Sequence, residues 1–192
     1  MARPREFDEA EVIARARDRF WGHGVAATSI ADLSEATGLS VGSIYKAFKS
    51  KDQLCARTLE DYVDQAQARA SSRLDDSASA LDGLRAWLDD YLQQATIDAP
   101  TCGCYAVELA TERAAVDDTV RDILVAHDAA MRTIVGRCVG RAVDAGELSG
   151  DPEGLTRLVL TTVNGLQVDA RKGLAAVDAR LTIDTLLTAA GA

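Results

Sequence analysis

Apolar residues recur every three or four positions through most of the chain, and this is the period of an α-helix. Runs of β-branched and aromatic residues, which are typical of strands, are scarce, whereas alanine is abundant. The pattern therefore predicts an all-α fold of about nine helices. We expect these helices over residues 8–23, 29–37, 41–48, 51–70, 80–97, 105–112, 117–145, 152–172 and 181–190.

Local signals place several of the expected helix ends. Gly38 suits the left-handed conformation that follows many helices, and Ser40 is a good N-cap for the helix after it. Asp151, followed directly by a proline, is a start signal for the eighth helix. The segment 71–79 is small and polar, and we expect it to connect the fourth helix to the fifth.

The two short helices over 29–37 and 41–48 are joined by a tight turn and preceded by the helix over 8–23. Two short helices that meet at such a turn and share a core with a third form a helix-turn-helix. The positions expected to face this core are Ile30, Leu33, Leu39, Val41, Ile44 and Phe48.

The other side of the helix over 41–48 carries small, polar, aromatic and basic residues. They are Gly42, Ser43, Tyr45 and Lys46, with Lys49 directly after the helix. A helix that enters the major groove needs small residues for close approach, hydrogen-bonding side chains for base edges and cations for phosphates. The segment therefore predicts a DNA-binding helix-turn-helix.

The stretch TSIADLSEATGLSVGSIYKAFKSKDQL resembles the DNA-binding signature of the TetR family of repressors, whose motif covers about residues 8–57 here. The resemblance implies that Thr28 and Lys51 hold phosphates, that Gly38 holds the turn and that the exposed side of the second short helix lies against the DNA. The residues assigned to DNA are Thr28, Ser40, Gly42, Ser43, Tyr45, Lys46, Lys49 and Lys51.

The formal net charge is −9, with Lys+Arg 21 and Asp+Glu 30, and taken alone it argues against a nucleic-acid partner. The charge is unevenly spread, however. Residues 1–57 hold nine basic and eight acidic side chains, whereas residues 58–192 hold 12 basic and 22 acidic ones. A nearly neutral DNA-binding segment is therefore attached to an acidic body that phosphates repel.

The composition excludes several other classes of protein. With 47% hydrophobic residues, the 192-residue chain can build a packed core and is not expected to be disordered. Its N-terminus lacks the apolar core of a signal peptide, and no run of about eighteen apolar residues could span a bilayer. Four cysteines in so long a chain do not form a disulfide scaffold. We expect a cytoplasmic protein without a membrane partner.

The family resemblance implies that the remaining helices form a regulatory domain that pairs two subunits and encloses a ligand cavity. We expect a DNA-binding domain over 1–50 and a regulatory and dimerisation domain over 51–192, with the helix over 51–70 as connector. A single recognition helix per chain independently favours a homodimer on a palindromic operator, because such DNA has two half-sites. The expected pairing surface is Leu155, Leu158, Val159, Thr162, Val163 and Leu166, with Leu181, Leu186 and Leu187.

The third expected partner, after DNA and a second subunit, is a small-molecule effector. The usual site for one is an apolar pocket with a few polar groups, and the middle helices carry suitable residues. His127 also has an interpretation as a core histidine, and Glu108 and Glu112 as solvated acids. The candidates for the pocket are Trp87, Tyr91, Cys104, Tyr105, Glu108, His127 and Met131.

Two alternatives remain open. Cys102 and Cys104 could bind a soft metal or react with an oxidant, which would make the protein a thiol- or metal-responsive sensor of the same family, although their spacing is not that of a zinc site. The other alternative is a small helical enzyme with a purely structural helix-turn-helix. Neither a Ser-His-Asp set nor a Gly-rich phosphate loop supports it, and His23 and His127 are far apart in sequence.

The sequence therefore favours a homodimeric, ligand-responsive transcriptional regulator that binds DNA. By the family resemblance it would be a repressor that a small molecule releases from its operator. We predict no enzymatic activity, no cofactor and no bound metal.

Overall fold

The computed structural model describes residues 7–75, 77–95, 103–173 and 176–191 of the chain. Within these ranges the chain folds into nine α-helices, so the predicted all-α class is confirmed. The helices are α1 (Glu9–His23), α2 (Ile30–Thr37), α3 (Val41–Phe48), α4 (Lys51–Asp75), α5 (Ala80–Ala95), α6 (Tyr105–Glu112), α7 (Asp118–Asp144), α8 (Pro152–Arg171) and α9 (Ala176–Ala190).

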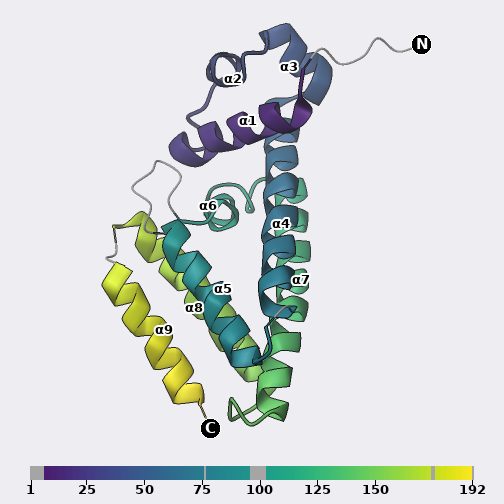
Figure 1. Cartoon of the computed structure of the whole chain (residues 1–192). Helices are drawn as coiled ribbons and strands as arrows, with labels where there is room; N and C mark the ends of the chain where they lie inside the picture. The colour runs from purple at the N-terminus through teal and green to yellow at the C-terminus, as the bar shows by residue number, and fades with distance from the viewer. Residues whose placement is uncertain (1–6, 76, 96–102, 174–175, 192) are drawn as a thin grey trace, which may run out of the picture.

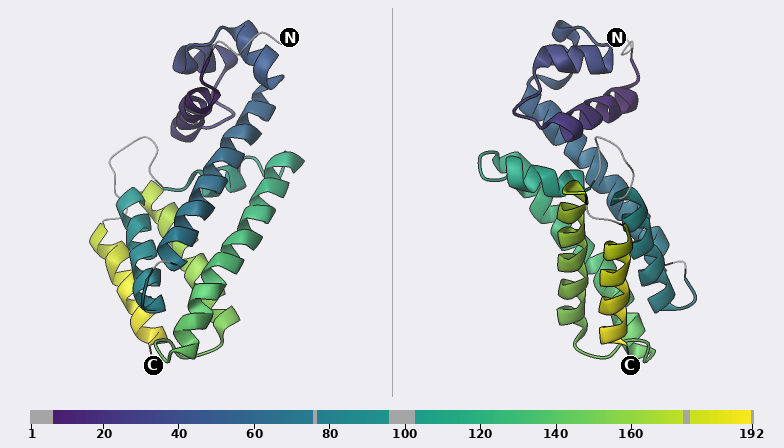
Figure 2. Two further views of the ribbon diagram at one scale, coloured as in Figure 1. Left: turned by 45° about the vertical axis from the view of Figure 1, so that its right-hand side comes forward. Right: turned by 90° about the vertical axis from the view of Figure 1, so that its left-hand side faces the viewer.

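Helices α1, α2 and α3 gather at one end of the molecule and form what we call the head (Figure 1). Helix α4 runs from the head along the length of the body, where it packs against α7. Helices α5, α8 and α9 lie on the other side of the body, and the short α6 lies between head and body (Figures 1 and 2). The C-terminus is at the end of the body farthest from the head.

The helix ends in the head follow from the side chains next to them. Ser29 caps α2 in a capping box: its hydroxyl accepts from the N–H of Asp32, and the Asp32 carboxylate accepts from the N–H of Ser29 at 2.8 Å. The hydrogen bonds from Ser29, followed by the charge of Arg19, lower the pKa of Asp32. Because such caps are local, α2 and α3 begin and end within one residue of the predicted limits.

Two predicted boundaries are wrong. The expected connection over 71–79 is helical in its first part, because α4 continues to Asp75 and buries Leu74 completely in the core of the body. Helix α9 begins at Ala176 instead of residue 181. The predicted end of the fifth helix at residue 97 lies outside the described residues.

Buried apolar side chains form two cores that meet along α4. The upper core joins α1 to α3 with the first half of α4, and Tyr105 and Leu109 of α6 complete it. The lower core joins the end of α4 to α5, α7, α8 and α9. The two cores therefore do not follow the domain boundary expected at residue 50. Helix α6 lies in the expected regulatory domain by sequence, but its buried side chains pack in the upper core with the head.

Candidate DNA-binding site

The turn between α2 and α3 is fixed by its own hydrogen bonds. Gly38 has a φ of 73°, which favours glycine, and its N–H donates to the carbonyl of Ser34. The hydroxyl of Ser34 donates to the carbonyl of Leu39 at 2.5 Å, and that of Thr37 donates to the carbonyl of Leu33 at 2.6 Å. The two helices are therefore held at a set angle without help from the body.

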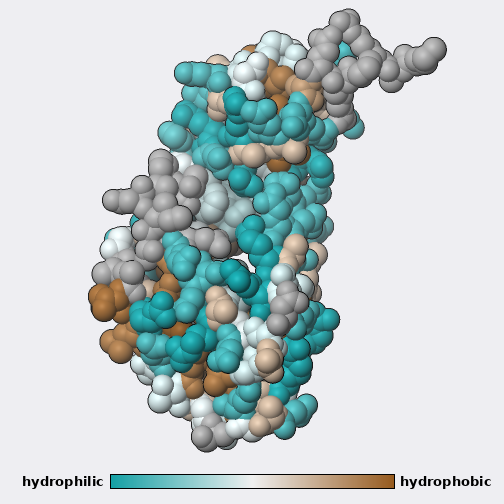
Figure 3. Space-filling view, viewed as in Figure 1, coloured by the Kyte–Doolittle hydropathy of each residue, from teal (hydrophilic) through white to brown (hydrophobic). Residues whose placement is uncertain are grey.

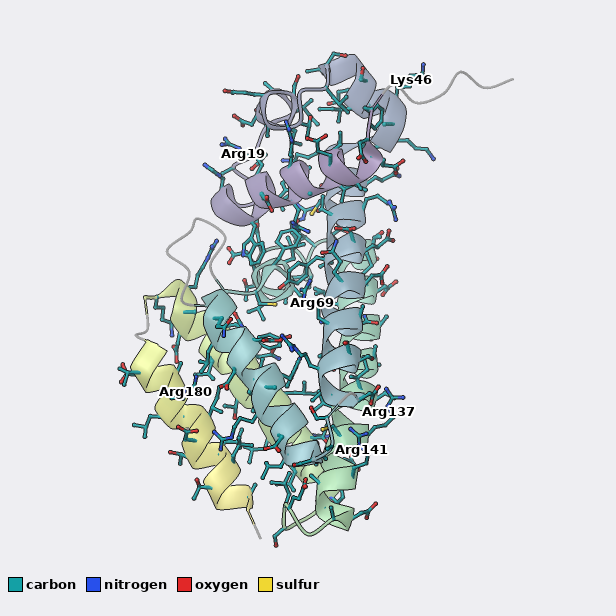
Figure 4. The ribbon with its side chains drawn as sticks, in the orientation of Figure 1. Arg19, Lys46, Arg69, Arg137, Arg141 and Arg180 are labelled. Atoms are coloured by element: carbon teal, nitrogen blue, oxygen red, sulfur yellow. The ribbon has the colours of Figure 1, made fainter. Side chains whose placement is uncertain are left out.

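Helix α3 presents an exposed face at the far end of the head. Val41 and Tyr45 are 42% and 48% exposed, and Lys46 points away from the body (Figure 4). The prediction that Val41 faces inward is wrong, because it is the first residue of α3 and lies beyond the edge of the core. A Cβ on Gly42 would meet nothing within 4 Å, so packing inside the protein does not require glycine there.

The predicted serines lie at the start of this face. The hydroxyl of Ser40 caps α3 by accepting from the N–H of Ser43. The hydroxyl oxygens of Ser40 and Ser43 are 2.9 Å apart and are joined by a hydrogen bond. Ser40 therefore has a capping role in the free protein, while Ser43 is half-buried beside it.

The cations of the head are of two kinds. The three arginines of α1, Arg15, Arg17 and Arg19, each pair with a carboxylate. The ammonium groups of Lys46 and Lys49, in contrast, have no ion pair or hydrogen bond with any described residue. These two lysines flank the exposed face of α3 and are available to phosphates.

Lys49 also stands in a strained turn. Its φ of 66° is the one positive value found at a residue other than glycine in the described part of the chain. The N–H of Ser50 donates to the carbonyl of Phe48 at 2.8 Å and closes a γ-turn around Lys49. The buried residues on both sides, Phe48 and Leu54, hold this turn between α3 and α4.

Thr28 and Lys51, assigned to phosphates by resemblance, have other partners in the structure. Thr28 is 1% exposed, and its hydroxyl donates to the carbonyl of Gly24 at 2.7 Å, so in the free protein this side chain is buried in the head and not open to a phosphate. The ammonium of Lys51 donates to the carbonyls of Val25 and Thr28 at 2.9 and 3.0 Å. Lys51 thus holds the loop between α1 and α2.

Glu112 holds the same loop from the other side, a role that the sequence did not indicate. Its two carboxylate oxygens accept from the backbone N–H of Val25 at 3.0 Å and of Ala26 at 2.7 Å. The interpretation of Glu108 and Glu112 as solvated acids is therefore wrong, since Glu108 pairs with Arg171 at 3.2 Å. A side chain from the end of α6 is bound directly to the head.

Comparison with known proteins identifies the family. Residues 12–58 match the family model described as bacterial regulatory proteins, tetR family, and residues 80–178 match that of the tetracyclin repressor-like C-terminal domain. The chain belongs to the TetR family. It is a DNA-binding transcriptional regulator, and the relatives found are regulators and not enzymes.

Individual relatives resemble this TetR-family chain over nearly its whole length. The HTH-type transcriptional repressor ComR of Escherichia coli is 26% identical over 89% of this chain and 83% of that protein. A cysteine mutant of the TetR family regulator CifR, solved with 26-bp double-strand operator DNA, is 29% identical and covers 98% of this chain and 100% of its own, with a TM-score of 0.86. A regulator from Agrobacterium tumefaciens, 23% identical over 95% of this chain and 97% of its own, shares the fold with a TM-score of 0.86.

Most of the predicted effector residues line pockets of this TetR-family regulator. The first pocket, of about 210 Å³, lies among α5, α6, α7 and α8 and includes Tyr91, Cys104, His127 and Met131. The second pocket, of about 230 Å³, lies between α6 and α8 and includes Cys104 and Glu108. A larger, open pocket of about 380 Å³ between α7 and the start of α8 contains none of the predicted residues.

Two predicted effector residues have different surroundings. Trp87 is buried in the lower core and borders a space of only about 20 Å³. Tyr105 is fully buried in the upper core, where its hydroxyl lies 2.9 Å from that of Thr58 and its ring packs edge-on against Tyr62. Tyr105 therefore belongs to the upper core and lines neither the first nor the second pocket.

The predicted pairing surface divides into a buried and an exposed part. Val159, Val163 and Leu187 are buried in the core of their own subunit. Leu158 is 49% exposed and Leu181 is 66% exposed, while the others are half-buried: Leu155, Thr162, Leu166 and Leu186. Helices α8 and α9 lie side by side at the surface, and hydrophobic side chains gather over α9 (Figures 2 and 3). Val168 of α8 and Val177 of α9 are exposed as well, and Val168 also borders the second pocket.

The described residues give no support to a metal site. In the described ranges, no three His, Cys, Asp or Glu side chains lie close enough together to hold a metal ion. Cys104 is half-buried, and its sulfur accepts a hydrogen bond from the hydroxyl of Tyr62 at 3.4 Å. Burial raises the pKa of Cys55 to about 12, which leaves that thiol protonated and unreactive. Cys102 lies outside the described residues.

The described helices were also compared with the length and hydropathy that a membrane span needs. None of them is long and apolar enough to cross a membrane.

The open space around Gly42 generates a prediction. Gly42→Ala should stabilise the fold by about 0.5 kcal/mol, because alanine favours helix and its methyl group meets no protein atom. The same methyl group should lower affinity for DNA from the region upstream of the gene about tenfold, as crowding by one methyl costs roughly 1–3 kcal/mol. Thermal unfolding and fluorescence anisotropy measure the two effects.

Gly140→Ala is the matched control, since a Cβ there also meets nothing within 4 Å and Gly140 lies on α7, far from α3. It should stabilise the protein and leave DNA affinity unchanged. Equal DNA affinity of the Gly42→Ala variant and the wild type would show that the backbone of α3 does not approach the DNA at this residue.

Proposed function

We propose that this TetR-family regulator is a homodimeric repressor that binds a palindromic double-stranded operator through α3 of each subunit. A small molecule in the first or second pocket would release it. The proposal is supported by the relative ComR, a repressor, and by the CifR structure with operator DNA. Since its partner is DNA, we place its action in the cytoplasm.

One observation carries the DNA-binding part of the proposal. The exposed face of α3 combines a site open to close approach at Gly42 with hydrogen-bonding groups at Ser43 and Tyr45. It also carries the ammonium groups of Lys46 and Lys49, which have no partner among the described residues. An α-helix with these groups fits a major groove, with the lysines toward the phosphates. The remaining charges of the described head are largely neutralised by internal pairs.

Helix α6 contacts both the pockets and the head, and could therefore couple ligand binding to the position of the head. Val107 and Cys104 line both pockets, while Tyr105 and Leu109 of the same helix belong to the upper core and Glu112 binds the head directly. A ligand that shifts α6 therefore changes its contacts with the pockets and its contacts with the head. The ligand must bind more tightly to the state in which the two α3 helices no longer match successive grooves, because only differential affinity shifts a population.

The pairing of subunits is proposed through α8 and α9. Leu158, Val168, Val177 and Leu181 form an apolar strip over these two helices, and a Cβ on Gly165 within it would meet nothing within 4 Å. Two such strips facing each other would bury four helices around a two-fold axis. The resulting dimer would present one recognition helix to each of the two half-sites of the operator.

Lys46→Ala tests the DNA contact. The substitution removes one unpaired cation per subunit, so affinity for duplex DNA from the region upstream of the gene should fall about tenfold at low salt, and the slope of log affinity against log salt should shrink by about 1 per subunit. Lys172→Ala is the control, because Lys172 follows α8 and pairs with Asp169 at 2.9 Å. Binding that ignores salt, or that Lys46→Ala leaves intact, would refute the proposed contact.

Leu181→Glu tests the pairing surface. A charge placed in a buried apolar interface should weaken the dimer by a factor of about 30 or more, measured by sedimentation equilibrium. Val125→Glu changes an equally exposed residue on α7, where Val125 is 64% exposed, and should leave the dimer unchanged. A Leu181→Glu variant that dimerises as tightly as the wild type would exclude α9 from the interface.

A further inference from the structure

Helix α8, which carries part of the proposed pairing surface, runs along the body toward the head (Figures 1 and 2). Its last residue is Arg171. The Nη2 atom of Arg171 donates to the backbone carbonyl of Trp21, near the end of α1, at 2.9 Å. A side chain of a pairing helix is therefore bound directly to the head.

The carbonyl of Trp21 is a suitable place for a cation. The last carbonyls of an α-helix have no N–H partner within the helix, and they form the negative end of its dipole. The N–H of Val25, four residues after Trp21, donates to the carboxylate of Glu112 at 3.0 Å instead. Arg171 thus acts as a C-terminal cap of α1 that is supplied from the body.

A second contact fixes the direction of the guanidinium group. Its Nε atom lies 3.2 Å from Oε2 of Glu108 on α6. The contacts to Glu108 and Trp21 use different nitrogens of one planar, rigid group, so together they set its position and its orientation. Gly103, with a φ of 85°, packs against the same end of α8, where a Cβ would lie 3.9 Å from Cδ of Arg171.

The contact from Arg171 differs from the other ties of the head in the helix from which it comes. Lys51 and Glu112 hold the loop between α1 and α2, but they belong to α4 and α6, which lie outside the proposed pairing surface. Helix α8 belongs to that surface, so the proposed dimer fixes its place relative to the two-fold axis. A contact between α8 and α1 therefore restricts the distance between the two heads.

The distance between the heads determines which DNA the dimer fits. The centres of two half-sites lie one helical turn, about 34–36 Å, or a multiple of it apart. One extra base pair between them increases this distance by about 3.4 Å and rotates one half-site about the DNA axis. Heads that move freely can follow such a change, whereas heads that are held in place cannot.

We propose that Arg171 is a positioning residue that sets the half-site spacing accepted by the dimer, because it fixes α1 of each head to the pairing helix α8. The inference rests on the proposed function, since it needs a homodimer that is paired through α8 on palindromic DNA. Without the guanidinium group the head stays attached through α4 and α6 but moves more freely relative to the two-fold axis.

Selection of binding sequences from a random duplex DNA library tests the proposal on the full-length protein. The wild type should enrich palindromes of one half-site spacing. Arg171→Met keeps an unbranched side chain and removes both contacts, so it should also enrich spacings one base pair longer and shorter. Inserting one central base pair into the best wild-type sequence should lower affinity about 100-fold for the wild type and about tenfold for the variant, measured by fluorescence anisotropy.

Arg180→Met is the matched control. It removes the same charge from the other pairing helix, α9, where Arg180 pairs with Asp89 at 2.8 Å (Figure 4). This variant should keep the single spacing. The melting temperature of Arg171→Met should fall by no more than about 4 °C, because a partly exposed contact adds little to stability. A merely structural role of Arg171 would lower the melting temperature and leave the spacing preference unchanged.

A single spacing retained by Arg171→Met would overturn the proposal. Equal enrichment of several spacings by the wild type would do the same, as would loss of all sequence-specific binding by a folded, dimeric Arg171→Met variant. A wild type that enriches no palindrome contradicts the proposed function itself, and the role of Arg171 falls with it. The wild-type selection therefore tests the function, and the comparison with the variant tests the inference.

Discussion

Two side chains of opposite charge hold the loop between α1 and α2, and the position of the head depends on them. Lys51 donates to the carbonyls of Val25 and Thr28, while Glu112 accepts from the N–H groups of Val25 and Ala26. Hydrogen bonds with one charged partner are roughly twice as strong as neutral ones. Since Lys51 begins α4 and Glu112 ends α6, the loop is tied to one helix that continues into the body and to another that lies between head and body.

This arrangement separates the shape of the DNA-binding surface from its orientation. The turn between α2 and α3 is held by bonds within the head, through Gly38, Ser34 and Thr37. Its orientation relative to the body depends on α4 and α6. Helix α6 has only eight residues and contributes to the upper core and to both pockets, so a small displacement changes both. An effector would therefore move the head as a rigid unit without altering the groups of α3 that we propose to contact DNA.

The sequence predicted the fold class, the helix-turn-helix and the limits of its short helices, because caps such as Ser29 and Ser40 act on their own turn. It did not predict the end of α4, since only packing against distant helices makes Leu74 a core residue. The roles of Glu112 and Lys51 were missed because both bind backbone groups of a loop, which leave no mark in a side-chain pattern. The place of Tyr105 in the upper core could not be predicted, because periodicity does not reveal which of two cores a short helix faces.

The central claim is that the end of α6 holds the head, and amide hydrogen exchange at Val25 and Ala26 tests it most directly. NMR exchange rates are compared between the wild-type dimer and Glu112→Ala, with Thr111→Ala as the neighbouring control, since the Thr111 hydroxyl bonds only within its own helix. The account predicts that both amides exchange about tenfold faster or more in Glu112→Ala and remain protected in Thr111→Ala. Unchanged protection of the two amides in Glu112→Ala would contradict it.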